Sequence, residues 1–520
     1  HLTGMKASRR IGSDTMDLVQ KFKMSIHGKG LLISGLISSA VCTDCHTSHR
    51  EQPAKDERSS VNKKNVALTC GKCHMGVYKQ FSKSIHGSVN AKADKKLPAC
   101  PDCHTAHEIG RTDKPKFILE ISHQCGICHK DVGDTYLQTY HGKAYTLGSL
   151  KTAKCSDCHG VHDILKVENP GSHLSRNNVI ETCKKCHQDA NRQFVGYLTH
   201  ATHHNRVKYP FLFFTFWGMT LLLTGTFGFF GIHTLLWLPK SIARYRQKQK
   251  EHIHDKGAKQ YLRFNLRERL LHLSVIISFF GLAITGMMLK FANMAWASAL
   301  AGLIGGAYNA ALIHRFCAVI TFGYFMVHLF FLYLNKRQSN SSIFQMLFDK
   351  NSIVPSLNDL IEFFQTIRWF LGLGERPKYG SWTYWEKFDY FAVFWGVAII
   401  GSTGLVLWFP EKFTLILPGW LINVATIIHS DEALLAVGFI FTIHFFNTHL
   451  RPDTFPMDPV IFTGRIPLSE LKHDRPREYE ELEVSGELEQ RLVAPVSETR
   501  MQVILVFGLT CLCIGVSLIG

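Results

Sequence analysis

The five-residue pattern Cys-x-x-Cys-His occurs six times in the first 190 residues of this 520-residue chain and constrains its fold more than any other feature. Twelve of the 15 cysteines belong to the pattern. A zinc site does not require a histidine directly after each second cysteine, and a disulfide requires no histidine at all. The repetition therefore indicates a chemistry that uses two thiols and one adjacent imidazole on a single short turn.

Covalent attachment of haem c uses this set of groups, because the thiols join the porphyrin vinyl groups and the imidazole becomes an axial ligand of the iron. The sequence therefore predicts six c haems. The attachment residues are Cys42 and Cys45, Cys70 and Cys73, Cys100 and Cys103, Cys125 and Cys128, Cys155 and Cys158, and Cys183 and Cys186. The predicted proximal ligands are His46, His74, His104, His129, His159 and His187.

The motifs alternate between two kinds, which we call A and B. The A motifs, which begin at Cys42, Cys100 and Cys155, carry a further histidine three residues after the motif histidine. The B motifs begin at Cys70, Cys125 and Cys183, and the first two are followed by His-Gly twelve residues after the motif histidine. Motifs of one kind lie 55 or 58 residues apart. A repeat of this length indicates stacked units that are too small to bury a core singly.

The N-terminal region holds more histidines than six proximal ligands require. This surplus favours six-coordinate irons with two histidine ligands, which carry electrons and do not bind small substrates. The candidates for distal ligands are His27, His49, His86, His107, His141 and His162, together with one of His200, His203 and His204.

Charge and compartment bound the function further. The formal charge is +17, and residues 1–209 hold 31 Lys and Arg against 18 Asp and Glu. Haem propionates would neutralise this basic excess, so it does not indicate nucleic-acid binding. Haem c is attached outside the cytoplasm, so we expect residues 1–205 to form a periplasmic domain. The chain begins with histidine, and we expect that a leader has been removed.

Six apolar segments follow, and they have the length that a hydrocarbon core of about 30 Å requires or come close to it. They are Pro210–Leu238, Leu270–Phe291, Leu312–Leu334, Phe388–Phe409, Leu421–Phe446 and Val503–Gly520. The loop 239–268 holds nine Lys and Arg and the loop 292–311 holds none, which predicts that 239–268 is cytoplasmic. We therefore expect a multi-pass protein of a bacterial or archaeal inner membrane, with its N-terminal domain in the periplasm.

The predicted fold is all-α, with a haem-packed, loop-rich multihaem cytochrome c domain followed by a six-helix transmembrane cytochrome b bundle. The bundle is expected over residues 206–470. A polar cytoplasmic segment is expected over 471–500 and a last membrane helix over 501–520. A helix at the membrane interface is expected over Leu357–Leu373.

Histidines inside the apolar segments are the second chemical signal, because an ionisable residue at membrane depth is usually functional. His314 and His328 lie 14 residues apart, and His429 and His444 lie 15 apart. Two such helices can hold two b haems, one near each membrane face. His272 is a fifth candidate, so one of the histidines near the cytoplasmic face is in excess.

A family resemblance bears on this excess. Arg267-Glu-Arg-Leu-Leu-His272, followed by Leu282-Ala-Ile-Thr-Gly286, resembles the first-helix signature of the dihaem cytochrome b subunits of formate dehydrogenases and hydrogenases. Ile313-His314-Arg315 resembles their second-helix ligand, and His429 with His444 resembles their last-helix ligands. The resemblance covers about residues 262–470. It implies a periplasmic-side haem on His314 and His429 and a cytoplasmic-side haem on His272 and His444. His328 either replaces His272 as a ligand or lines a quinone pocket.

The domain order resembles the Cbc-type inner-membrane quinone oxidoreductases of bacteria that respire metals or other extracellular acceptors. It implies electron transfer between the quinone pool (menaquinone or ubiquinone), two b haems and six c haems, with periplasmic c-type cytochromes as partners. We expect Asp431, Glu432 and His328 to act at quinone sites. We also expect the haem on His429 to exchange electrons with the haem at Cys183 and Cys186.

Two other functions stay open. The N-terminal domain could be a terminal reductase, for which one iron would need an open distal position. The chain could also be a membrane anchor and electron conduit for a separate dehydrogenase, hydrogenase or reductase subunit.

Overall fold

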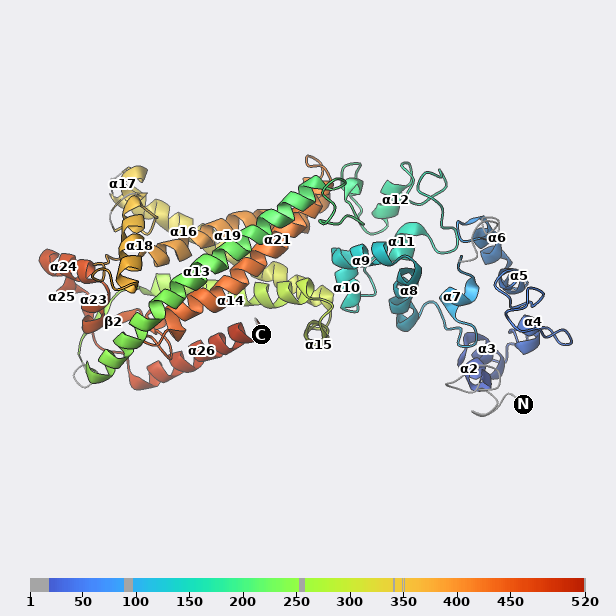
Figure 1. Cartoon of the computed structure of the whole chain (residues 1–520), viewed down its shortest axis with the longest axis horizontal. Coiled ribbons are helices and arrows are strands. Elements are labelled where there is room, and N and C mark those ends of the chain that lie inside the picture. The colour runs from blue at the N-terminus through green and yellow to red at the C-terminus, as the bar shows by residue number, and fades with distance from the viewer. Residues whose placement is uncertain are drawn as a thin grey trace. The chain divides into compact units, whose positions relative to one another are not determined.

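The computed structural model of the chain describes residues 18–87, 97–251, 258–339, 342–347, 349 and 351–518 (Figure 1). The chain divides into two compact units. Unit 1 comprises residues 1–201 together with the short segments 292–298 and 411–419, and unit 2 comprises the rest. Lys256 of the predicted cytoplasmic loop lies outside the described residues.

Unit 1 consists of short helices joined by long loops. Three of its helices coincide with the A motifs, so that each attachment segment is a single helical element. The helices of unit 1 are α2 (Leu18–Met24), α3 (Ile26–Leu32), α4 (Cys42–His46), α5 (Val66–Gly71), α6 (Met75–Lys83), α7 (Cys100–His104), α8 (Pro115–Cys128), α9 (Lys130–Gln138), α10 (Tyr140–Thr146), α11 (Cys155–His159), α12 (Val179–Lys184) and the 3-10 turn η1 (Phe194–Gly196).

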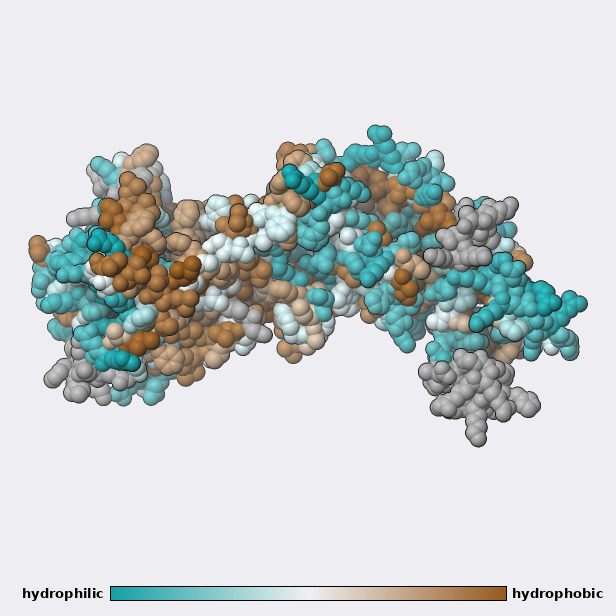
Figure 2. Space-filling view, viewed as in Figure 1, coloured by the Kyte–Doolittle hydropathy of each residue, from teal (hydrophilic) through white to brown (hydrophobic). Residues whose placement is uncertain are grey.

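Unit 2 contains six helices that are long and apolar enough to cross a membrane, which confirms the predicted transmembrane character within the described residues. Figure 2 shows hydrophobic residues gathered over these helices. They are α13 (Pro210–Glu251), α14 (Leu266–Lys290), α16 (Ala307–Ser339), α19 (Tyr384–Trp408), α21 (Trp420–Phe439) and α26 (Glu498–Ser517). Two π-helical segments, η2 (Ile440–His444) and η3 (Phe446–Leu450), continue α21.

Polar capping sets where several of these helices begin. The side chain of Asn265 accepts a hydrogen bond from the Glu268 N–H (3.0 Å), and the Glu268 carboxylate accepts one from the Asn265 N–H (2.8 Å). This reciprocal arrangement satisfies backbone donors that the first helical turn leaves unpaired. The Glu386 carboxylate caps α19 in a similar way, accepting from the Thr383 N–H at 2.9 Å. The helices therefore begin several residues before the apolar runs that identify them in the sequence.

The shorter helices of the second half include α18, which falls within the segment predicted as an interfacial helix. They are α15 (Ala295–Ile304), α17 (Ile343–Leu347), α18 (Leu357–Phe370), α20 (Pro410–Phe413), α22 (Val460–Thr463), α23 (Leu468–Asp474), α24 (Pro476–Ser485) and α25 (Glu487–Gln490).

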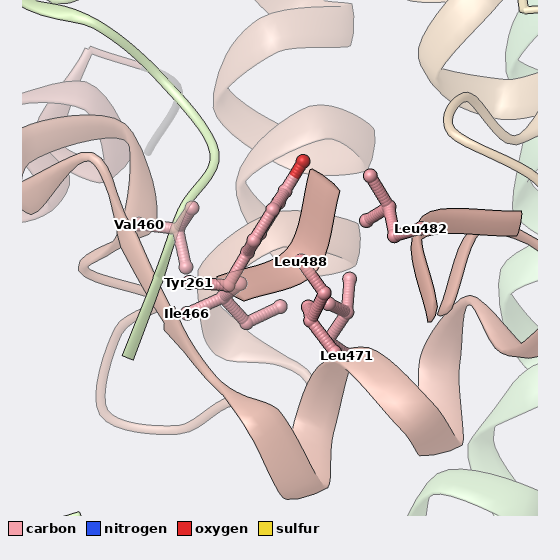
Figure 3. Packing of buried hydrophobic residues seen from close by; sticks show 6 residues of the cluster. All are labelled: Tyr261, Val460, Ile466, Leu471, Leu482 and Leu488. Carbon is pink, nitrogen blue, oxygen red and sulfur yellow. The ribbon is translucent and has the colours of Figure 1, made fainter. Parts of the chain in front are cut away.

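A small antiparallel sheet departs from the all-α prediction. Its strands β1 (Gln260–Leu262), β2 (Arg465–Pro467) and β3 (Leu492–Val493) lie in the order β2-β1-β3. Tyr261 of β1 packs in a buried apolar cluster that also contains Leu471 and Leu482 (Figure 3). The segment 471–500 is polar in composition, yet it contributes side chains to this core.

Candidate metal centres

Each A motif forms one helical turn that is capped by its own acidic residue. The carboxylate at the third motif position accepts a hydrogen bond from the backbone N–H of the residue before the motif. The three bonds are Val41 N–H to Asp44 at 2.8 Å, Ala99 N–H to Asp102 at 2.7 Å, and Lys154 N–H to Asp157 at 2.8 Å. Such a bond stabilises a short helix that could not persist by backbone bonding alone. The capping carboxylate therefore explains why the A motifs read Cys-x-Asp-Cys-His.

The His-Gly segments are built on a second recurrent turn. Ser25 accepts a hydrogen bond from the Gly28 N–H at 3.0 Å, and Thr139 accepts one from the Gly142 N–H at 3.1 Å. A Cβ atom at Gly28 would lie 2.0 Å from a backbone carbonyl oxygen, and one at Gly142 would lie 2.2 Å from another. Only glycine allows this approach, so the glycine after each of these histidines fixes the imidazole on a defined turn.

The structure places a second histidine ring opposite each of the six motif histidines. The ring centroids of the six pairs lie 6.0 to 6.3 Å apart. The pairs, with the motif histidine first, are His46–His107, His74–His27, His104–His162, His129–His86, His159–His200 and His187–His141.

This spacing fits a metal ion held between two imidazoles. A metal–nitrogen bond is about 2 Å long and a ring centroid lies about 1 Å behind its nitrogen, so the two centroids should be about 6 Å apart. Among the described residues, no group of three or more His, Cys, Asp or Glu could hold a metal ion. Two imidazoles leave most of a coordination sphere unfilled, so these pairs fit a metal whose remaining ligands come from a planar cofactor.

The pairs interlace neighbouring repeats. The histidine three residues after one A motif faces the proximal histidine of the A motif before it, and the His-Gly histidines face the next B motif along the chain. Backbone bonds join the two sets: Ile26 N–H donates to Ile109 O at 2.7 Å, and Ile85 N–H donates to Ile164 O at 2.8 Å. These four residues flank His27, His107, His86 and His162. Each junction is therefore completed by segments from two repeats.

Burial favours the form of histidine that binds metals. It lowers the pKa of His141 and of His159, and in each case the paired histidine lowers it further. Burial likewise lowers the pKa of His104, with His162 and His74 contributing in the same direction. A lower pKa keeps the imidazole neutral at physiological pH, and the neutral ring is the metal ligand.

Three candidate distal residues lie elsewhere. His200 is the member of its group that faces a motif histidine, and its Nδ1 lies 3.1 Å from Val132 O. His203 belongs to unit 2, where its ring stacks on Phe216 at 3.9 Å and also contacts His204. His49 is exposed, and within the described part of the chain no ring contact joins it to another histidine.

One proximal candidate has a carboxylate partner that the sequence did not reveal. His187 Nδ1 lies 2.5 Å from Glu411 Oε1 in unit 1. Asn191 holds the same segment by donating to Glu411 O at 3.1 Å. A carboxylate on the outer nitrogen fixes the ring orientation and raises the basicity of a histidine ligand. Because Glu411 is 224 residues away in the sequence, no local pattern could have identified it.

In unit 2, His314 of α16 and His429 of α21 form a seventh pair with ring centroids 6.2 Å apart. Their Nδ1 atoms are engaged, with Thr285 Oγ1 2.9 Å from His314 and Ile400 O 3.0 Å from His429. The Nε2 atoms are therefore the ones available for a metal. A Cβ at Gly404 would lie 3.0 Å from the His429 ring, so this glycine allows the ring to approach α19 closely.

The second membrane set has three histidines. His272 and His444 lie within electrostatic range of each other, and His444 Nδ1 lies 2.9 Å from Asp389 Oδ2. His449, which the sequence analysis did not single out, interacts electrostatically with both. It follows His444 by five residues in π-helical backbone, and a π-helix returns to the same side after about five residues. A fixed α-helical period does not reveal this relationship.

The other residues predicted to act in the membrane have different partners. His328 Nε2 lies 2.7 Å from the Tyr390 hydroxyl, and no described histidine ring faces it. Lys290 Nζ lies 2.7 Å from Asp431 Oδ1, so Asp431 is held in an ion pair. Trp395 donates to Glu432 Oε1 at 2.7 Å, and the buried Glu432 Oε2 has no hydrogen-bond partner among the described residues.

These features define a multi-pass, mainly helical membrane protein with paired histidines in both units. No family model matches the chain, and no curated protein or solved structure matches it either.

Proposed function

We propose that the chain moves electrons between the membrane quinone pool and periplasmic acceptors by way of two b haems and six c haems. The observation that carries the proposal is the pairing of each of the six motif histidines with a second histidine at 6.0 to 6.3 Å. Haem bound between two imidazoles supplies reversible one-electron transfer without a site for a small substrate. This favours an electron conduit over a terminal reductase.

The proposal assigns the protein groups as follows. The six motif pairs would hold the c haems, the pair His314 and His429 would hold one b haem, and His272 with His444 would hold the other. Asp389 would orient His444, as Thr285 would orient His314. The order of the two parts is also the basis of the resemblance to Cbc-type quinone oxidoreductases.

Quinone oxidation releases protons, so a quinone site needs groups that accept them. Of the two acidic candidates on α21, Glu432 fits this role better than Asp431. The ion pair with Lys290 stabilises the charged form of Asp431, whereas Glu432 has one buried oxygen that no described group engages. We therefore assign the proton-accepting role to Glu432 and a structural role to the ion pair.

The test is a haem count combined with a quinol assay. Mass spectrometry of the denatured chain should show six covalent haem additions, and the reduced spectrum should show two further b haems. A short-chain quinol should then reduce the c haems of the purified protein. Four or fewer covalent haems would contradict the assignment of the motifs, and a full haem complement without quinol reduction would contradict the quinone step.

The topology yields a separate prediction. A periplasmic N-terminal domain requires residues 239–268 to be cytoplasmic, because α13 crosses the membrane once between them. A reporter that is active only in the cytoplasm should therefore be active when it is inserted into this loop. Activity of a periplasm-specific reporter at the same position would invert the topology.

Glu411→Gln should raise the midpoint potential of one c haem, the haem attached at Cys183 and Cys186. A carboxylate on the outer nitrogen of His187 makes the ligand more basic and stabilises oxidised iron, and the amide does so less. We expect a rise of roughly 60 mV, which is a tenfold change in a one-electron equilibrium. Potentiometric titration followed by electron paramagnetic resonance measures it.

The matched control for Glu411→Gln is Asp189→Asn. It breaks the exposed ion pair between Asp189 and Lys412 (2.7 Å) beside the same segment, but it leaves the bond between His187 and Glu411 in place. Its potentials should equal those of the unmodified protein. Equal shifts in both variants would show that the segment acts through its fold and not through the Glu411 carboxylate.

A further inference from the structure

We propose that His49 is an axial ligand for the iron of a c haem that a partner carries and that is attached at none of the six motifs. The inference rests on the proposed function, in which the paired histidines hold haem. Its starting point is the rule by which the repeats exchange ligands. His107 faces His46 with centroids 6.1 Å apart, and His162 faces His104 at 6.0 Å. In both cases the histidine after one A motif serves the A motif before it.

His49 occupies the same position after the first A motif as His107 and His162 do after the next two. By the exchange rule, it would serve an A motif that comes before Cys42. Residues 1–41 of the chain contain no cysteine. The imidazole that the rule assigns to a preceding haem therefore has no such haem among the six motifs.

The backbone presents His49 in the same way as its two counterparts. The residue after each A-motif helix has a positive φ, with Thr47 at 67°, Thr105 at 65° and Gly160 at 87°. For a β-branched residue such as threonine this conformation is strained, so a sequence without a use for it would be expected to lose it. The first repeat keeps the strained turn that points the following histidine at a neighbouring haem.

Exposure separates His49 from the histidines that have a partner. The side chains of His107 and His162 are half-buried, whereas that of His49 is exposed. The next residue, Arg50, is also exposed, and its positive charge suits the propionates of a haem. The surface around His49 is thus an unfinished junction of the kind that lies between the internal repeats.

The coordination of the other irons selects the occupant. Each of the six motif histidines already faces a second imidazole, so none of these haems needs His49. A second copy of the chain would offer the same six filled sites. The occupant is therefore a c haem with one histidine ligand and an open opposite position. Its binding would extend the electron path beyond the first motif of this chain.

A titration of the haem-loaded, full chain with a five-coordinate haem c peptide tests the inference. The peptide is enriched in a Mössbauer-active iron isotope, so that the spectrum reports only the added iron. One equivalent should change from high spin to low spin as the imidazole binds. In His49→Ala the affinity should fall at least about tenfold, because even changes around a metal ligand cost that much. The matched control is His123→Ala, which removes another exposed histidine of unit 1.

Low-spin conversion that is lost in His49→Ala and kept in His123→Ala would support the site. Absence of conversion in the unmodified protein, or equal conversion in both variants, would overturn it. So would a new high-spin haem among the six of His49→Ala, since His49 would then serve the chain itself. The haem mass of the same samples separates these results from a failure of the proposed function, because that failure would appear as missing haem additions before any peptide is added.

Discussion

His429→Ala is expected to lower the b-haem content from two per chain to one while all six c haems stay attached. His429 faces His314 across 6.2 Å on a neighbouring helix, and no other described histidine lies opposite His314. An iron that loses one of two axial imidazoles in an apolar site is bound much more weakly, whereas covalent haems do not depend on this residue. Quinol should then no longer reduce the c haems, although dithionite still should.

The matched control is His328→Ala, which removes a histidine at similar depth in the same helix pair region. His328 contacts the Tyr390 hydroxyl at 2.7 Å and faces no histidine ring in the described structure. This variant should therefore keep both b haems. Loss of a b haem in His328→Ala together with an unchanged content in His429→Ala would reverse the ligand assignment. Difference spectra of the reduced and oxidised protein measure both.

The sequence predicted the long elements well because their cause is local. A membrane helix needs an uninterrupted apolar run, and each of the six runs was found as a helix. Their ends could not be predicted as closely, because polar residues extend several helices. The helix α13 continues past Leu238 and through Pro239 to Glu251. The three-stranded sheet was missed because two or three residues per strand carry no readable pattern and β1 lies about 200 residues before β2 in the chain.

The candidate sites show the same limit. The motif histidines and the surplus around them were visible, because spacing along the chain reveals both. Which histidine faces which could not be predicted, since each pair joins different repeats and depends on how the repeats fold against one another. Glu411 beside His187 and Asp389 beside His444 were missed for the same reason. His449 was missed because the π-helical backbone shifts the period on which the search relied.

The crossed pairing in unit 1 leads to a prediction that sequence proximity would not make. His107 follows the motif histidine His104 by three residues, but its ring faces His46 at 6.1 Å with planes only 3° apart. His107→Ala should therefore open the distal position of the haem attached at Cys42 and Cys45 and leave the nearer haem at Cys100 intact. One high-spin haem per chain should appear, and it should bind carbon monoxide. Electron paramagnetic resonance and carbon monoxide titration measure the change.

A second set of substitutions identifies the haem that has changed. Replacing Cys42 and Cys45 by alanine removes the haem that His46 would ligate, and this deletion is combined with His107→Ala. If the pairing is crossed as the structure has it, the high-spin signal disappears in the combined variant, because the opened haem is no longer attached. If His107 instead serves the haem of its own motif, the signal persists and the haem at Cys100 and Cys103 is the one that opened. The persistent signal would show that the repeats do not exchange ligands, and the basis for the site at His49 would be removed with it.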